Sequence, residues 1–193
     1  MEEAMTADAL ASRHTAAWRA GTVHPFLAGV RDGSVPENCF DRWLAQDYLY
    51  AQALMRAQSR IAAAAPLADV GLLAGGVVNT VGELSWFEQM AARRGVVLDA
   101  PLHPTTRAYC DFLLALTSSG YPAQITAIWA LERTYLESWD GARPGAQPYP
   151  SSSTGGPPTT SGPTSATSNV ALIASLRPAS TTRPERLSTP SSG

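Results

Sequence analysis

The composition of the chain changes abruptly near residue 150, and this change limits where a core can form. All fifteen aromatic residues lie at or before Tyr149. Between Ser151 and Gly193, Ser, Thr, Pro and Gly fill 29 of 43 positions, and Glu185 is the only acidic residue. Such a segment buries too little apolar surface to offset the entropy lost on folding. We therefore expect one folded domain over residues 1–149 and a low-complexity, disordered tail over residues 150–193.

Helical patterns dominate the first 149 residues. Gly95 suits the end of a helix, and Pro122 suits the beginning of one. Apolar residues at helical spacing predict five helices: about Thr6 to Gly21, a segment including residues 40–61, Leu67 to Arg94, a segment after LHPTT with Tyr109, Phe112, Leu113 and Leu116 on one face, and Pro122 to Trp139. No alternating run of β-branched residues is long enough for a sheet. The sequence thus predicts an all-α bundle.

Charge and cysteine content narrow the possible partners. The formal net charge of -2 argues against nucleic acid, which binds a basic face. Cys39 and Cys110, with no secretory signal ahead of them, indicate a reducing compartment. No continuous apolar stretch reaches the roughly 18 residues of a membrane span. His14 and His24 lack the spacing of a metal site, and we expect His24 to pack or cap locally. We expect a cytoplasmic protein without metal, cofactor, nucleic-acid partner or membrane partner.

Asp47 stands on the apolar face of the predicted helix over residues 40–61. It lies four residues after Trp43 and four before Ala51, on a face that also carries Phe40 and Leu44. An unpaired carboxylate in such a place is strongly unfavourable or takes up a proton. Either neighbouring groups satisfy Asp47, or the position serves binding or catalysis.

Glu132 repeats this anomaly in the last predicted helix, three residues after Trp129 and four after Ile128. Two helices of one bundle therefore each direct a carboxylate inwards. The nearby hydroxyl donors are Tyr48, Tyr50, Tyr109 and Tyr135. Acids beside aromatic rings suit a pocket for a flat, nitrogen-rich ring, which stacks on the aromatic faces and donates to the acids. The structural alternative is pairing of each acid with Arg42, Arg56, Arg107 or Arg133.

The segment HPFLAGVRDGSVPENCFDRWLAQDYLY is similar to the signature of the TenA family, the thiaminase II relatives. That signature has an HPF start, a short DG turn and then F-x-x-W-L-x-Q-D-Y-x-Y. The segments ELSWFEQMAARRG and HPTTRAYCDFL are similar to later helices of the family, so the resemblance covers about Trp18 to Tyr149. It implies a haem-oxygenase-like all-α fold and a homo-oligomer, commonly a tetramer.

The resemblance also implies roles for individual residues. Asp47 matches the aspartate that binds the aminopyrimidine ring, Tyr50 matches a stacking residue, and Tyr109 matches a tyrosine near the reacting carbon. Leu131 stands where thiaminase II members carry a nucleophilic cysteine. Glu132 and Tyr135 instead form the E-x-x-Y of the cysteine-less TenA branch.

That branch is associated with the salvage of degraded thiamine. Its members hydrolyse 4-amino-5-aminomethyl-2-methylpyrimidine, or its formyl derivative, to the hydroxymethyl product, and Glu132 is then the acid/base candidate together with Asp47. Three alternatives stay open: thiaminase II activity, a non-catalytic ligand-binding or regulatory role, and haem or quinone-cofactor chemistry on the same fold. Without a thiolate at position 131, we expect little thiaminase activity.

The tail lacks any likeness to the further helices of the family, which end in a catalytic glutamate. All basic residues are arginine, which indicates a GC-rich gene. A shift of one base then converts SSSTG, SGPTSATSN and STPSSG into FVEHW, FRPYVRDLE and VDAFLG, which are similar to those helices. We interpret the tail as a frameshift product, the alternative being a natural disordered tail. The resemblance therefore implies a haem-oxygenase-like bundle that is incomplete at its C-terminus, with weak or no activity in the chain as written.

Overall fold

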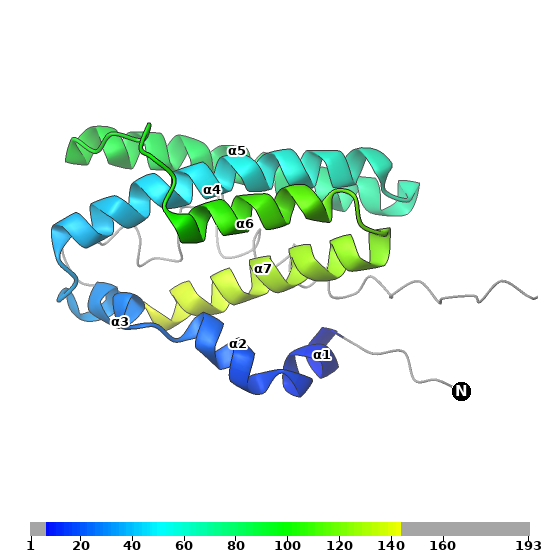
Figure 1. The fold of residues 1–193 in the computed structure, drawn as a ribbon, viewed down its shortest axis with the longest axis horizontal. Helices are drawn as coiled ribbons and strands as arrows, with labels where there is room; N and C mark the ends of the chain where they lie inside the picture. The colour runs from blue at the N-terminus through cyan, green and yellow to red at the C-terminus, as the bar shows by residue number, and fades with distance from the viewer. Residues whose placement is uncertain (1–6, 144–193) are drawn as a thin grey trace, which may run out of the picture.

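The computed structural model describes residues 7–143, and all the regular structure in that range is helical (Figure 1). The helices are α1 Ala7–Arg13, α2 Thr15–Thr22, α3 Pro25–Asp32, α4 Glu37–Ala64, α5 Leu67–Arg94, α6 Pro104–Leu116 and α7 Tyr121–Gly141. The all-α prediction is confirmed. The predicted tail, residues 150–193, lies outside the described residues.

The two long helices α4 and α5 run side by side, and α6 packs against α4 (Figure 1). Helix α7 lies along the other side of the bundle, where it contacts α2 and α3 as well as α4 and α6. Gly33, at φ 80°, makes the turn from α3 towards α4, and Gly95, at φ 70°, ends α5. Both torsion angles lie in the left-handed region that glycine adopts without strain.

Three groups of buried side chains hold the helices together. The largest lies between α4, α6 and α7 and includes Leu54, Ile61, Leu113 and Ile128. A second group joins α3, the start of α4 and the end of α7, and comprises Val30, Val35, Phe40, Trp139 and Ala142. A third lies between α4 and α5, and comprises Leu44, Ala51, Trp86, Phe87, Met90 and Ala91. Trp43, which packs against the second and third groups, also lines a cavity of the bundle.

Trp43 borders that cavity. Its ring centroid lies 5.1 Å from that of Phe40, 5.9 Å from that of Phe87 and 4.9 Å from that of Trp139. The indole thereby joins the second and third groups of buried side chains, which fixes the rotation of α4 relative to α5 and α7. That rotation decides which way Asp47, one turn later, points.

The sequence predictions of helix bounds and faces fail mainly at the N-terminus and on α6. The single helix predicted from Thr6 to Gly21 is two helices, which are separated at His14. Beside this break the hydroxyls of Ser12 and Thr15 donate to main-chain carbonyls, which competes with a continuous helix. Helix α3 was not predicted, although its cap was: the His24 ring accepts a hydrogen bond from the main-chain N–H of Phe26. On α6, Leu113 and Leu116 are buried, whereas Tyr109 and Phe112 are 49% and 46% exposed.

Helix α5 is, by length and composition alone, apolar enough to cross a membrane, contrary to the sequence expectation. Only 11% of its most apolar window is buried. The same helix packs lengthwise on α4 and directs Glu83 into the interior of the bundle. Its packing makes α5 a wall of the helical domain.

Candidate functional site

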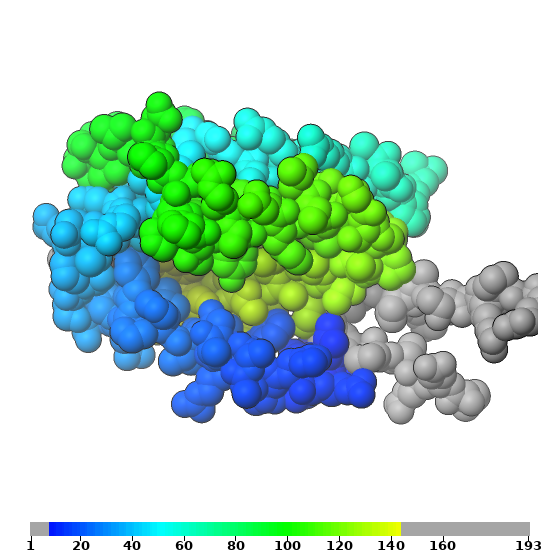
Figure 2. Space-filling view, in the orientation of Figure 1, coloured from blue at the N-terminus to red at the C-terminus, as the bar shows by residue number. Residues whose placement is uncertain are grey.

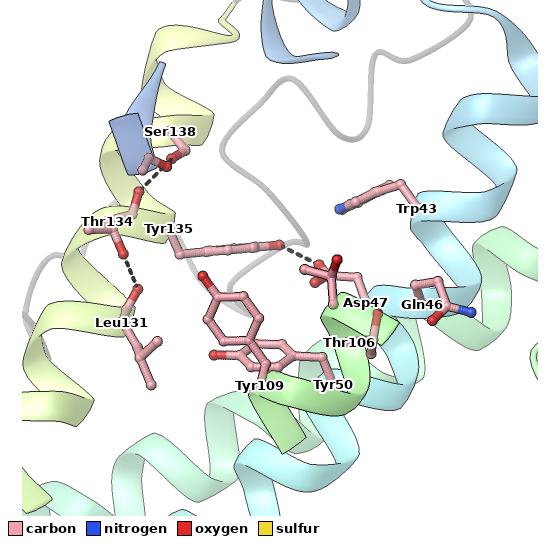
Figure 3. Close-up of a pocket in the computed structure, with 12 residues that line it drawn as sticks. Trp43, Gln46, Asp47, Tyr50, Thr106, Tyr109, Leu131, Thr134, Tyr135 and Ser138 are labelled. Atoms are coloured by element: carbon pink, nitrogen blue, oxygen red, sulfur yellow. Dashed lines mark hydrogen bonds between the residues drawn. The ribbon is translucent and has the colours of Figure 1, made fainter. Parts of the chain in front are cut away.

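A cavity of about 280 Å³ lies between α4, α6 and α7 (Figure 3). It is lined by Gly21, Trp43, Gln46, Asp47, Tyr50, Thr105, Thr106, Tyr109, Leu131, Thr134, Tyr135 and Ser138. In the space-filling view, the surface is hollowed between α6 and the α2–α3 segment (Figure 2). A cavity of this volume suits one small ring with short substituents.

A smaller chamber of about 30 Å³ adjoins the main cavity. The two share Asp47, Tyr50, Leu131 and Tyr135 in their walls. The chamber is completed by Ala51, Leu54, Glu83, Phe87 and Glu132. A volume of this size accommodates one or two water-sized groups, since a bound water needs roughly 10–15 Å³. We call this space the inner chamber.

Asp47 lies at the junction of the two spaces. On α4, Asp47 lies beside the face that carries the buried Leu44 and Ala51, and its side chain lines the cavity. The Tyr135 hydroxyl of α7 donates to its Oδ2 at 3.4 Å (Figure 3). Burial raises the pKa of Asp47 to about 7, although the hydrogen bond from Tyr135 opposes this rise. The group therefore changes protonation state near neutral pH, as acid/base catalysis requires.

Glu132 faces the inner chamber from α7, and a buried polar relay holds it there. Gln58 Nε2 donates to Glu132 Oε1 at 2.9 Å, and the Thr80 hydroxyl donates to Gln58 Oε1, also at 2.9 Å. Gln58 and Thr80 are only 2% and 3% exposed, so the relay behind Glu132 is shielded from water. Burial raises the pKa of Glu132 to about 7, and the hydrogen bond from Gln58 opposes this rise.

Glu83 of α5 is a third carboxylate of the site, and the sequence analysis missed it. It lines the inner chamber together with Asp47 of α4 and Glu132 of α7. Burial, followed by the charges of Glu132 and Asp47, raises its pKa to about 8. Its position carries a helical signal, because it lies three residues after the buried Thr80 and four before the buried Phe87. In sequence this signal is weaker than that of Asp47 and Glu132, because α5 is apolar on several faces, with Val78 and Val81 exposed.

Three tyrosines form the aromatic part of the wall. The rings of Tyr50 and Tyr109 meet edge to face, with centroids 5.9 Å apart and an interplanar angle of 81°. Tyr135 completes the group from α7 (Figure 3). Burial and the neighbouring acids raise the pKa of the Tyr50 and Tyr135 hydroxyls well above the ordinary value, so both stay protonated donors. The suggestion that Tyr48 offers a hydroxyl donor to the site is wrong. Its hydroxyl donates to Glu88, and Tyr48 does not line the cavity.

The structural alternative, pairing with arginine, does not hold for these acids. Within residues 7–143, salt bridges join Arg94 to Asp41, Arg133 to Glu137 and Arg143 to Asp140, and none reaches Asp47, Glu83 or Glu132. The described lining residues of both spaces include no basic side chain. Among the described residues, the three carboxylates thus share a site whose walls carry no basic side chain.

The position of the cysteines bears on nucleophilic chemistry. Leu131 lines both the main cavity and the inner chamber, at the place predicted for a cysteine in thiaminase II (Figure 3). Neither Cys39 nor Cys110 belongs to either wall, and burial raises the pKa of the Cys110 thiol. No group of three or more metal-ligating side chains is found among the described residues. The described walls combine carboxylates and aromatic rings with polar side chains, namely Gln46, Thr105, Thr106, Thr134 and Ser138, and they include no thiol.

Comparison with known proteins identifies relatives of the TenA type in both sequence and structure. A protein from Glycine max named "Probable bifunctional TENA-E protein" is 32% identical over 135 residues, covering 66% of this chain and 59% of its own length. The chain thus spans about 59% of that relative.

Two solved structures share the fold. A TenA homologue from Pyrococcus furiosus superposes with a TM-score of 0.78 at 23% identity, over 86% of this chain and 80% of that one. A TenA family transcription regulator from a Silicibacter species gives 0.73 at 20% identity, over 90% and 80%. The haem-oxygenase-like fold implied by the sequence is thereby confirmed. The model of the TENA/THI-4/PQQC family matches residues 11–146, and the chain belongs to this family.

Proposed function

We propose that the site hydrolyses the exocyclic C–N bond of an aminomethyl or formylaminomethyl pyrimidine and yields the hydroxymethyl pyrimidine for thiamine salvage. The observation that carries this proposal is the meeting of Asp47 and Glu132, from separate helices, at one site whose described lining includes tyrosines and no basic side chain. The TENA-E name of the Glycine max relative is consistent with this reaction class.

Ring recognition follows from the protonation behaviour of Asp47. An aminopyrimidine presents an amino N–H next to a ring nitrogen that accepts a proton. With a pKa of about 7, the Asp47 carboxyl donates a proton to the ring nitrogen while its other oxygen accepts from the amino group. The two parallel hydrogen bonds orient the ring in the main cavity, and Tyr50 and Tyr109 contact its faces or edges.

Hydrolysis requires a water to attack the exocyclic methylene while the amine departs. The water oxygen forms the new C–O bond, the C–N bond breaks, and the departing nitrogen keeps the bonding electron pair. A carboxyl group with a pKa of about 7 accepts the proton that the water loses and returns a proton to the nitrogen. We assign this role to Glu132, which the Gln58 hydrogen bond holds at the inner chamber. The amine and water are converted to the alcohol and ammonia.

The nature of residue 131 supports hydrolysis over thiaminase chemistry. Thiaminase chemistry by covalent catalysis needs a thiolate at the pyrimidine methylene, and the side chain at that place is the hydrocarbon of Leu131. Direct attack by water needs no protein nucleophile. We therefore expect release of ammonia from the aminomethyl pyrimidine and little release of thiazole from thiamine.

The decisive experiment measures ammonia release from 4-amino-5-aminomethyl-2-methylpyrimidine. We expect Asp47→Ala and Glu132→Gln each to lower the rate by about 10²-fold or more, the range lost with a general acid or base. The assay uses the 193-residue chain and a version with the tail translated in the shifted frame. Binding of the pyrimidine without turnover in both versions would instead favour the non-catalytic alternative. Rapid cleavage of thiamine would contradict the proposal.

A further inference from the structure

Among the described residues, the side chains of the inner chamber that can carry charge near neutral pH are all carboxylic acids. Asp47 enters from α4, Glu83 from α5 and Glu132 from α7, and the rest of its wall is aromatic or aliphatic apart from the Tyr50 and Tyr135 hydroxyls. Within residues 7–143, Glu83 makes no salt bridge or hydrogen bond. Glu132 accepts from Gln58 and Asp47 accepts from Tyr135, but Glu83, which also lines the chamber, has no hydrogen-bond donor among the described residues. A carboxylate left in this state favours a ligand that brings N–H donors or positive charge.

The size of the chamber restricts what that ligand group can be. About 30 Å³ admits a water, an ammonium or a terminal –NH3⁺, but no ring. The chamber adjoins the main cavity through Asp47 and Tyr50, so a ring bound on Asp47 can extend a one-carbon substituent into it. An N-formyl group is larger than –NH3⁺, is neutral and adds a carbonyl acceptor that would face carboxylates.

We propose that the inner chamber is a subsite for a primary ammonium group and that Glu83 is its specificity-determining residue, which selects the free aminomethyl pyrimidine over the N-formyl derivative. This inference rests on the proposed function, because it assumes that the ring occupies the main cavity. It assigns the three acids different tasks. Asp47 orients the ring, Glu132 handles the reacting protons, and Glu83 binds the ammonium.

Proton release provides a signature of this assignment. Burial holds Glu83 protonated up to about pH 8 and Asp47 and Glu132 up to about pH 7. The other titratable groups that face Glu83 are the Tyr50 and Tyr135 hydroxyls, whose pKa values are raised well above the ordinary value and which therefore stay neutral. An ammonium in the chamber favours ionised carboxyls, so its binding at pH 7 expels protons. A neutral formyl derivative does not.

The test uses the full 193-residue chain and equilibrium titration calorimetry at pH 7 in buffers of different ionisation enthalpy. The two ligands are the aminomethyl pyrimidine and its N-formyl derivative. The variants are Glu83→Gln, which keeps the shape of the side chain, and the matched control Glu88→Gln on the same helix. Glu88 is exposed, accepts from Tyr48 outside the cavity, and belongs to neither wall. Far-UV circular dichroism verifies that both variants fold.

We expect Glu83→Gln to weaken binding of the amine about tenfold, as for the loss of a charged hydrogen-bond partner, and to change binding of the formyl derivative less than about twofold. Glu88→Gln should change neither. Wild-type protein should prefer the amine and release protons with it, a measurement that stands even if Glu83→Gln does not fold. Two outcomes would overturn this inference while leaving the proposed function in place. One is an equal loss of affinity for both ligands in Glu83→Gln, and the other is wild-type protein that neither prefers the amine nor releases protons on binding it. Wild-type protein that binds neither ligand would overturn the proposed function itself.

Discussion

At the scale of single residues, Gln58 matters most among the side chains that touch no cavity. Its amide donates to Glu132 and accepts from Thr80, so it fixes both the position and the charge state of the proposed acid/base group. We predict that Gln58→Leu raises the pKa of Glu132, because the donor that favours the carboxylate is gone. The acidic limb of the pH–rate profile should move to higher pH, and the rate at pH 7 should fall about tenfold or more.

Gln124 offers a matched control for this substitution. It is also a buried glutamine, 6% exposed, but its amide donates to main-chain carbonyls of Leu116, Thr117 and Ser119 at the α6–α7 turn. Gln124→Leu should lower stability by about 1–3 kcal/mol, the cost of unsatisfied buried carbonyls, and leave the pH profile in place. A shift of the profile in both variants would show that Gln58 acts only through stability.

The residues of the site were predicted unevenly, for physical reasons. Asp47 and Glu132 were identified because a charge in an amphipathic helix interrupts a well-defined apolar stripe. Glu83 was missed because α5 is apolar on several faces, with Val78 and Val81 68% and 48% exposed, so no stripe marked its inner side. Tyr48 was assigned to the cavity wrongly, since one residue beyond Asp47 on a helix means a turn of about 100°.

At the scale of elements, Gln46 couples α4 to the start of α6. Its side-chain amide donates to the Pro101 carbonyl at 3.0 Å, and its carbonyl accepts from the His103 main-chain N–H at 2.8 Å. His103 then caps α6 through its ring nitrogen, which accepts from the N–H of Thr105. The first turn of α6 supplies Thr105 and Thr106, and the next turn supplies Tyr109, to the cavity wall.

We therefore predict that Gln46→Ala loosens the first turn of α6 and weakens pyrimidine binding several-fold, with a small change in global stability. Hydrogen exchange at the amides of residues 105–109 should accelerate while exchange in the core of α4 stays unchanged. Gln89→Ala on the exposed face of α5 serves as the control. Unchanged exchange at α6 together with full loss of binding would mean that Gln46 contacts the ligand directly, contrary to this prediction.

The long helices were predictable from sequence, whereas the short ones were not. The predicted bounds of α5 are those observed, and the predicted start and end of α7 lie within two residues of the observed ones. These helices carry long apolar stripes and clear end signals such as Gly95 and Pro122. Helices α2 and α3 have only eight residues each, too few to be stable alone. Contacts with α7, such as the hydrogen bond from Trp18 Nε1 to Glu137, hold α2 in place.

At the scale of the whole molecule, the three half-buried acids of the site give stability an unusual pH dependence. Their pKa values of about 7, 8 and 7 lie above the roughly 4 of the unfolded chain. Between about pH 4 and pH 8 the native state therefore binds more protons than the unfolded state, and stability falls as pH rises. The stabilisation that comes from the protonated acids is fully present below about pH 4 and is lost as the pH rises through about 7 to 8.

We predict that the urea midpoint is lower at pH 8 than at pH 5.5. Glu83→Gln, which carries no charge at either pH, should raise the midpoint at pH 8 more than at pH 5.5 and so flatten the dependence. Asp69→Asn is a suitable control, because Asp69 accepts from Tyr121 at the far end of α5 and belongs to neither wall of the site. A midpoint that rises from pH 5.5 to pH 8 would contradict the burial of these acids.

The relation between the domain and the tail gives the last prediction. The family match covers residues 11–146, and the composition changes after Tyr149, so the two boundaries nearly coincide. On α6, Phe112 and Leu114 are 46% and 59% exposed, which is a large apolar area for one short helix. The strings FVEHW, FRPYVRDLE and VDAFLG, obtained by a shift of one base, contain the aromatic and aliphatic residues that would pack on such a bundle.

We predict that the gene carries codons compatible with all three strings. Protein translated in that frame should then melt at a higher temperature than the 193-residue chain and turn over the pyrimidine at least about tenfold faster, because added buried apolar surface stabilises the site. Thermal unfolding and ammonia release, measured on both proteins side by side, provide the comparison. Codons that cannot encode those strings would make the tail a natural segment, and equal melting temperatures would show that the domain is complete without them.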